Sequence, residues 1–157
     1  MTTLHIWVDG ACSPNPGLGG WGIYMKYGDI EKDFSGAVPN STNNTMELLA
    51  SIKALEQLKK KCDVIIYSDS NYVVQGITEW SKNWVKKNFK GIKNVELWKT
   101  LIALDNIYQP KWVWVKGHGT NAGNIRADEL AVQARLNYLA AKQNPINLDN
   151  LLVLPDV

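Results

Sequence analysis

Cysteine is scarce in this sequence, and so are long apolar runs. Cys12 and Cys62 stand fifty positions apart without a Cys-x-x-Cys pair, so neither a disulfide framework nor a zinc site is indicated, and free thiols are expected. The chain lacks a run of the roughly 18 apolar residues that a membrane span needs, and its first residues do not follow the layout of a signal peptide. We therefore expect a cytoplasmic protein that does not contact a membrane.

A marked excess of charge is also missing from the chain as a whole, but not from its parts. The 17 Lys and Arg residues against 15 Asp and Glu residues give a net charge of +2. Residues 82–116, however, contain eight lysines and two acidic residues, a local net charge of +6, which leaves −4 for the remainder. This asymmetry predicts a polyanionic partner on one side of the protein and a cationic partner on the other.

The length of 157 residues and the hydrophobic fraction of 45% fit one globular domain. Asn144 and Pro145 begin a polar and aliphatic segment at the C-terminal end. We assign residues 1–143 to the domain and residues 144–157 to a tail, and we expect a monomer.

Hydrophobic spacing predicts strands in the first part of the chain and alternating helices and strands in the rest. Residues 3–9, 21–27 and 30–38 have the composition of strands, the last two joined as a hairpin through Gly28 and Asp29. Helices are expected from residue 44 to the lysines at 59–61 and over 70–77, 79–87, 94–108 and 124–142, with strands over 63–68 and 111–117. Because strands joined through helices pair in parallel, this order predicts an α/β fold. Its five-stranded mixed sheet would have three antiparallel strands followed by two parallel ones, flanked by helices.

Four acidic residues fall where such a fold places ligands. Asp9 and Asp69 end strands that are expected to be parallel neighbours, while Glu47 and Asp128 lie early in helices. Each acid alone also has a structural explanation: Asp9 could open a turn, Asp69 could cap a helix, Glu47 fits a capping box, and Asp128 suits a helix dipole.

Taken together, the four carboxylates would repel one another unless a cation neutralised them. Carboxylate ligands favour a hard metal such as Mg²⁺ or Mn²⁺ over zinc. Two such ions about 3.5–4 Å apart can position an attacking water and stabilise the leaving oxygen in phosphodiester cleavage. His118, in a loop of Gly, Thr and Asn, suits proton transfer, although it could also be an ordinary surface histidine.

Lysines alternate with aromatic residues in the basic part of the chain. The stretch SKNWVKKNFKGIKNV contains five lysines together with Trp84 and Phe89, and Trp80 and Trp98 are close in sequence. Lysines neutralise phosphates and aromatic faces stack on sugars or bases, so we expect a nucleic acid to bind here. The alternative is a solvated basic face whose tryptophans belong to the core.

The sequence closely resembles bacterial ribonuclease H of type 1 over roughly residues 4–140. The resemblance is carried, in order, by the blocks VDGACSPNPGLGGWG, STNNTMELLASIKALEQLK, YSDSNYVVQGITEW, NVELW and WVWVKGHGTNAGNIRADELA. It implies the ribonuclease H-like fold with a basic protrusion, and hydrolysis of the RNA strand of an RNA·DNA hybrid by two metal ions, leaving 5′-phosphate and 3′-hydroxyl ends. It also implies that Asp9, Glu47, Asp69 and Asp128 bind two Mg²⁺ ions, for which Mn²⁺ can substitute, and that His118 is the mobile catalytic histidine.

Positions that contact the hybrid in this family are matched as well. The resemblance implies minor-groove contacts from Cys12, Asn15, Asn43, Asn44 and Asn71, phosphate contacts from Thr42 and Asn94, a place for Trp80 in the DNA channel, and a place for Asn124 beside the metals. Lys86, Lys87 and Lys90 would lie along the DNA strand. Asn40 stands where members of the family often carry an arginine, which removes a bidentate phosphate donor.

Two other functions fit parts of this pattern. A proofreading-type exonuclease also uses carboxylate-bound metals, but it usually carries a second acid two residues after the first aspartate, where this sequence has Ala11. A non-catalytic module that binds hybrids would have no need of four acids and a mobile histidine.

Overall fold

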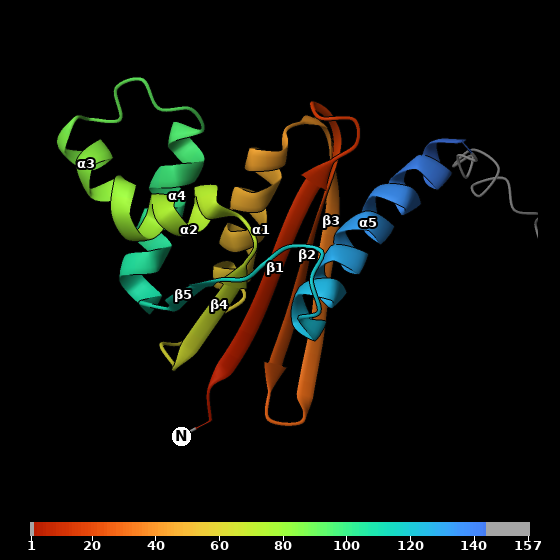
Figure 1. Ribbon diagram of the computed structural model, residues 1–157, viewed down its shortest axis with the longest axis horizontal. Coiled ribbons are helices and arrows are strands. Elements are labelled where there is room, and N and C mark those ends of the chain that lie inside the picture. The colour runs from red at the N-terminus through yellow and green to blue at the C-terminus, as the bar shows by residue number, and fades with distance from the viewer. Residues whose placement is uncertain (1, 144–157) are drawn as a thin grey trace, which may run out of the picture.

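The computed structural model describes residues 2–143, in which five strands form one mixed sheet (Figure 1). The strands are β1 (Leu4–Cys12), β2 (Gly17–Tyr27), β3 (Ile30–Ser41), β4 (Val64–Ser68) and β5 (Lys111–Trp114). They are ordered β3-β2-β1-β4-β5, with β1, β2 and β3 antiparallel and with β4 and β5 added in parallel. The predicted fold class is therefore confirmed, whereas the predicted tail lies outside the described residues.

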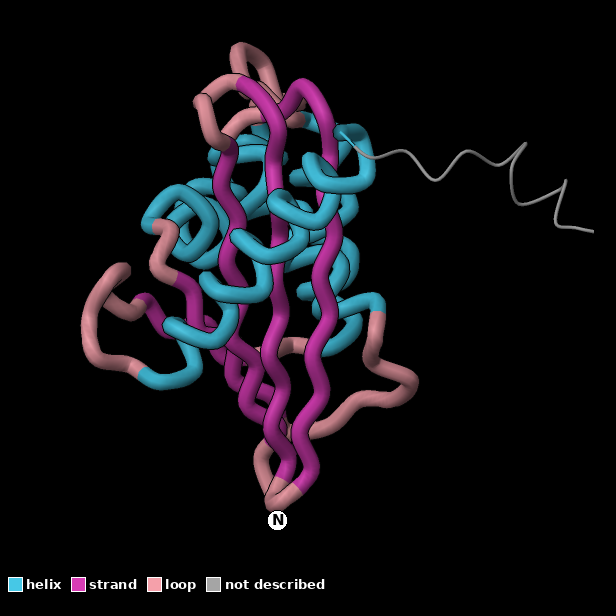
Figure 2. The backbone as a smooth tube through the Cα atoms, turned by 90° about the vertical axis from the view of Figure 1, so that its right-hand side faces the viewer, coloured by secondary structure: helices cyan, strands magenta, loops and turns pink. Residues whose placement is uncertain are grey.

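Helices cover both faces of this sheet. They are α1 (Asn43–Glu56), α2 (Asn71–Gln75), α3 (Ser81–Lys86), α4 (Val95–Tyr108) and α5 (Ala122–Gln143), with a π-helical turn at Gly76–Trp80 between α2 and α3. Helix α1 packs on one face with α4 beyond it, and α5 runs across the other face (Figures 1 and 2). None of the helices in the described part of the chain combines the length and apolar character needed to cross a membrane.

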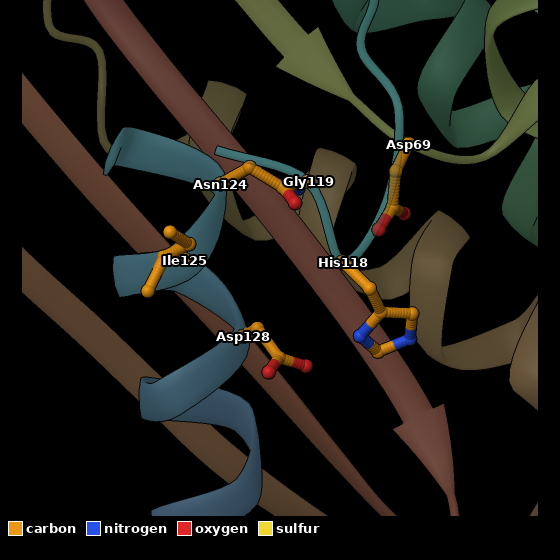
Figure 3. Close-up of a pocket in the computed structure, with 6 residues that line it drawn as sticks. All are labelled: Asp69, His118, Gly119, Asn124, Ile125 and Asp128. Atoms are coloured by element: carbon orange, nitrogen blue, oxygen red, sulfur yellow. The ribbon is translucent and has the colours of Figure 1, made fainter. Parts of the chain in front are cut away.

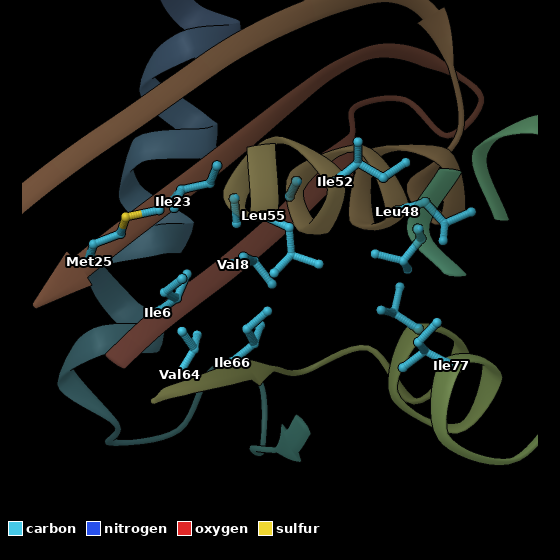
Figure 4. Packing of buried hydrophobic residues seen from close by; sticks show 14 of the residues in the cluster. Ile6, Val8, Ile23, Met25, Leu48, Ile52, Leu55, Val64, Ile66 and Ile77 are labelled. Carbon is cyan, nitrogen blue, oxygen red and sulfur yellow. The ribbon is translucent and has the colours of Figure 1, made fainter. Parts of the chain in front are cut away.

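The main hydrophobic core lies between α1 and the sheet and extends toward α2 and α4 (Figure 4). Alternate residues of β1, Ile6 and Val8, point into it and are fully buried. They belong to the same buried cluster as Leu48 and Leu55 from α1 and Ile66 from β4. Helix α1 on this face of the sheet and helix α5 on the opposite face both contact β1, the strand that bears Asp9.

The first strand is longer than the sequence predicts. Asp9 does not end β1, because antiparallel pairing with β2 continues through Cys12 opposite Gly19. The parallel pairing with β4 does stop just before Asp9, at Val8 opposite Ser68. Asp9 therefore lies where the parallel pairing ends, as expected, although β1 itself continues beside β2.

The segment expected to be a loop after the first strand also contributes to the sheet, because β2 begins at Gly17. Its glycines allow a close approach of α5. A Cβ atom at Gly20 would lie 2.1 Å from the Ala131 carbonyl oxygen, and one at Gly22 would lie 2.3 Å from that of Ala127. Helix α5 therefore packs directly on the backbone of β2.

The two short helices expected over 70–77 and 79–87 form one continuous helical run. The widened turn at Gly76–Trp80 joins them, and Gly76 faces the fully buried Trp98, whose ring would lie 2.2 Å from a Cβ atom there. Helix α1 ends before the lysines at 59–61, and β5 ends at Trp114. The basic protrusion stays a prediction.

Candidate active site

Three carboxylates from three separate elements meet at the carboxyl end of the parallel pairing between β1 and β4. Asp9 lies on β1, Glu47 on α1, and Asp69 directly after β4, and each offers an oxygen within 4.8 Å of the others. This convergence follows from the register. Because the pairing of β1 with β4 stops at Val8 and Ser68, the residues that follow emerge side by side.

The structural explanations for single acids are wrong for three of them. The N-cap of α1 is Thr42, whose Oγ1 accepts from the Thr45 backbone N–H, so Glu47 belongs to no capping box. Ser70, not Asp69, caps α2, and its Oγ accepts from the Val73 N–H. Asp128 lies beyond the first turn of α5, which begins at Ala122. These carboxylates are therefore not used as caps.

Burial and mutual repulsion raise the pKa values of two of the acids, Asp9 and Glu47. Burial, followed by the charge of Asp69 and a hydrogen bond with Asp128, raises the pKa of Asp9 to about 8. Burial, followed by the charges of Asp9 and Asp69, raises the pKa of Glu47 well above its ordinary value. The Glu47 Oε2 atom is buried and has no hydrogen-bond partner among residues 2–143. A divalent cation fits this donor set, because it would satisfy that oxygen and neutralise the repulsion.

Asp128 reaches the same site from α5, across a pocket of about 270 Å³ that Asp69, His118 and Asn124 also line. The side chains of Asp69, Asp128 and His118 converge there (Figure 3). Asp128 lies outside the set of three mutually close carboxylates, but it is close enough to Asp9 to contribute to the rise in the pKa of that residue. Three of the four acids thus form a close group, and Asp128 lines the pocket beside it; a metal site of all four acids stays a prediction.

His118 and Asn124 differ sharply in exposure. His118 is exposed, lies in the loop between β5 and α5 with a left-handed backbone (φ 55°), and is flanked by Gly117 and Gly119. Asn124 is only 2% exposed, and its Nδ2 has no partner among the residues that the structure describes. His118 thus lines the pocket from an exposed loop, whereas Asn124 lines it from a buried position on α5.

Three of the predicted hybrid-binding residues form one connected group beside the acids. The Asn43 Oδ1 accepts a hydrogen bond of 2.8 Å from the Cys12 backbone N–H, and the Asn43 N–H donates to the Asn15 Oδ1 at 3.0 Å. Asn44 and Asn71 are exposed at the starts of α1 and α2. The structure brings these five residues to the end of the sheet where the carboxylates lie.

A second pocket has a volume of about 380 Å³ and is lined by Thr42, Asn44 and Asn94. Asn94 has a left-handed backbone (φ 58°). Its Oδ1 accepts a hydrogen bond from the Thr45 hydroxyl, and its Nδ2 donates one to the Tyr72 hydroxyl. Tyr72 was not predicted from the sequence. Its Oη also accepts from the indole N–H of Trp98 at 2.9 Å, a contact between distant segments that has no local signal in the sequence.

The lysines and aromatic residues of the basic segment separate into exposed and buried sets. Trp80 is 41% exposed and lies 6.1 Å from Trp84, whereas Trp98 is fully buried. Lys86, Lys87 and Lys90 are all exposed, at the end of α3 and in the turn that follows. The alternative of a core role therefore applies to Trp98 but not to Trp80.

Comparisons with known proteins agree with this geometry. The RNase H family model matches residues 1–135. The chain is 50% identical to a Ribonuclease H of Bradyrhizobium diazoefficiens over 90% of this chain and 98% of that protein, and 52% identical to one of Dichelobacter nodosus over 83% and 91%.

Solved structures show the same likeness. The crystal structure of LC9-RNase H1, a type 1 RNase H with the type 2 active-site motif, matches with a TM-score of 0.80 at 27% identity, covering 87% of this chain and 74% of that one. LC11-RNase H1 in complex with an RNA/DNA hybrid matches with a TM-score of 0.68 at 22% identity, covering 87% and 99%, and shares the fold.

Proposed function

Because the chain belongs to the ribonuclease H family and is thus a nuclease, we propose that it cleaves the RNA strand of RNA·DNA hybrids internally with two bound divalent cations. The products would carry 5′-phosphate and 3′-hydroxyl ends. We assign this activity to residues 1–143, with Mg²⁺ as the cation, Mn²⁺ as a substitute, and a cytoplasmic monomer as the working form.

The observation that supports the metal requirement is the cluster of Asp9, Glu47 and Asp69 within 4.8 Å, which includes the buried, unpartnered Oε2 of Glu47. Together with Asp128, these side chains would hold the cations. Bound divalent cations supply a water nucleophile and charge neutralisation at the leaving oxygen. The protein's part is to hold the carboxylates in place. Because burial raises the pKa values of Asp9 and Glu47, a bound cation would displace their protons, and the same burial keeps competing water away from them.

Two further side chains would act on the substrate itself. The exposed His118 can accept a proton from the attacking water or deliver one to the leaving oxygen, since an imidazole ring can act as a proton acceptor and as a donor. Asn124 lines the pocket, and its Nδ2, which has no partner in the described part of the chain, could donate to a phosphate oxygen of the cleaved strand. Neither role requires the side chain to bind metal.

Recognition of the hybrid would use two surfaces. Cys12, Asn15, Asn43, Asn44 and Asn71 present small polar groups that can reach 2′-hydroxyls in a wide minor groove. For the DNA strand, Thr42 and Asn94 would bind a phosphate in the second pocket. Trp80, Lys86, Lys87 and Lys90 would follow its backbone. A fold relative that binds an RNA/DNA hybrid supports this choice of partner.

The test incubates the protein with four end-labelled substrates, namely an RNA·DNA hybrid, duplex RNA, duplex DNA and a duplex containing one ribonucleotide, with Mg²⁺ or with EDTA. Internal cleavage of only the hybrid's RNA strand, abolished by EDTA, is the expected result. Stepwise release of mononucleotides from an end would indicate an exonuclease instead. Binding without any cleavage would indicate a non-catalytic module.

A further inference from the structure

Aromatic rings lie on the sheet next to the carboxylates. Trp7 stands two residues before Asp9 on β1, so these two side chains lie on the same side of that strand. Tyr67 is on β4, two residues before Asp69, which follows the end of that strand. The register pairs Trp7 with Tyr67 on β4 and with Tyr24 on β2. Its ring lies 4.7 Å from that of Tyr67 and 5.4 Å from that of Tyr24, nearly parallel to the first.

The first turn of α5 rests on the Trp7 indole. A Cβ atom at Gly123 would lie 2.1 Å from Cε2 and 2.4 Å from Nε1 of that ring, so the helix backbone touches it directly. The next two turns of α5 lie instead against the bare backbone of β2, at Gly22 and Gly20. Over β1 and β2, helix α5 therefore meets an aromatic ring at its start and glycine backbone farther along, and the ring supports its first turn above the sheet.

The height of that turn determines where α5 presents its polar side chains. Asn124 directly follows Gly123, and Asp128 lies on the next turn, and both line the pocket that holds Asp69. The Trp7 Nε1 is buried without a hydrogen-bond partner in the described chain, 2–143. The indole is thus held by its shape and not by its polar atom.

We propose that Trp7 is a positioning residue of the metal site: its indole supports Gly123 and so holds Asp128 and Asn124 at the correct distance from Asp9 and Asp69. The inference rests on the proposed function, because it assumes that Asp128 is a metal ligand. It makes Trp7 and Gly123 a matched pair, in which the small residue on the helix fits the large one on the strand.

The test measures metal binding apart from activity. Mn²⁺ is titrated calorimetrically into the substrate-free protein, and the Mg²⁺ concentration for half-maximal cleavage is measured alongside kcat and KM. Trp7→Leu should weaken Mn²⁺ binding and raise the Mg²⁺ requirement by about tenfold or more, as outer-shell changes do at metal sites. The loss should appear in kcat with KM for the hybrid unchanged. His5→Leu is the matched control, because His5 belongs to the same ring cluster, 5.9 Å from Trp7, yet is not among the atoms nearest Gly123.

A compensating pair sharpens the test. Gly123→Ala should weaken Mn²⁺ binding because its methyl group collides with the indole, and adding Trp7→Leu should restore part of that loss. Mn²⁺ binding by Trp7→Leu at the wild-type level would overturn the inference, as would an equal loss in His5→Leu. If Trp7→Leu does not fold, Trp7→Phe and Gly123→Ala decide the question in the same way. Failure of the proposed function would show separately, as absence of hybrid cleavage by the wild-type protein.

Discussion

At the scale of single residues, the site concentrates acidic groups that the fold itself would be more stable without. Asp9 is 5% exposed and Glu47 is 8% exposed, and both face further carboxylates. Burying like charges without a counter-ion costs free energy, which the raised pKa values of both groups reflect. The stability of the metal-free protein should therefore depend on pH.

The sign of that dependence follows from Asp9. Its pKa of about 8 in the folded protein against 3.8 in a free side chain means that the folded state binds more protons between these values. This contribution to stability is fully present below about pH 4 and is lost as the pH rises through about 8. In EDTA, we expect the melting temperature of the wild-type protein to fall over that range by more than that of Asp9→Asn.

Calorimetric melting curves at several pH values, with EDTA and with Mg²⁺, check this prediction. Because a cation competes with the bound protons, the stabilisation by Mg²⁺ should grow from acidic to mildly alkaline pH. Parallel curves for the wild-type protein and Asp9→Asn would contradict it.

Asp69 supplies the most direct test of catalysis at this scale. Asp69→Asn should lower kcat by at least about 100-fold, since loss of a metal ligand should exceed the 10–100-fold effect of an outer-shell change. Hybrid affinity in EDTA should not weaken, because removing a negative charge near phosphates does not disfavour binding. Asp29→Asn, which changes an exposed acid in the turn between β2 and β3, is the control. Full activity of Asp69→Asn with Mg²⁺ would sink the metal assignment.

Sequence reasoning could identify the acids but not the details around them. Asp9 and Asp69 could be predicted from the sequence, because the rule that ligands bind at the carboxyl ends of parallel strands needs only the approximate ends of two strands. Whether Glu47 was a cap depended on where α1 begins, and a shift of two residues, to a cap at Thr42, decided it. Tyr72 was missed because its role depends on Asn94 and Trp98, which only the tertiary structure brings to its hydroxyl.

At the scale of elements, the contact between α5 and β2 is made through glycines. Gly20→Ala should destabilise the protein by about 1–3 kcal/mol, because the new methyl group would collide with the Ala131 carbonyl oxygen 2.1 Å away and displace the helix. Denaturant titration measures this change. Asn137→Ala, an exposed change on the same helix, should stay within about 0.5 kcal/mol of wild type. Equal stabilities of the two variants would show that α5 does not depend on this close approach.

Those same glycines explain why the early strands were predicted too short. The run SPNPGLGG has the composition of a loop, and only the tertiary structure reveals that Gly19 and Gly20 are strand residues, Gly19 packed against Met46 of α1 and Gly20 against Ala131 of α5. The division of residues 70–87 into two helices failed for a related reason. The widened turn at Gly76–Trp80 accommodates Trp98, a contact between segments that are distant in sequence.

At the scale of the whole molecule, the uneven charge seen in the sequence corresponds to separate surfaces. The acidic cluster lies where the parallel pairing of β1 and β4 ends, whereas Lys86, Lys87 and Lys90 are exposed on and after α3. Replacing all three lysines with Ala should raise the Kd for hybrids and reduce the slope of log Kd against log salt by up to about 2–3 units, because each phosphate contact contributes about 0.9. Fluorescence anisotropy over a salt series gives both values.

The control carries the same change in charge elsewhere. Alanines at the lysines of 59–61, beyond the C-terminal end of α1, should leave the salt dependence as it is. If the triple variant kept the wild-type slope, Lys86, Lys87 and Lys90 of the wild-type protein would be solvated side chains that do not contact phosphates.

The order in which the acids occur along the chain has a consequence for synthesis. Asp9, Glu47 and Asp69 come from the first half of the sequence, but Asp128 comes from α5, the last described helix. A growing chain can thus assemble the sheet's first four strands and gather three carboxylates well before the fourth has been made. Under the proposed function, the nascent protein passes through an inactive stage, and nuclease activity begins only when α5 docks on β2.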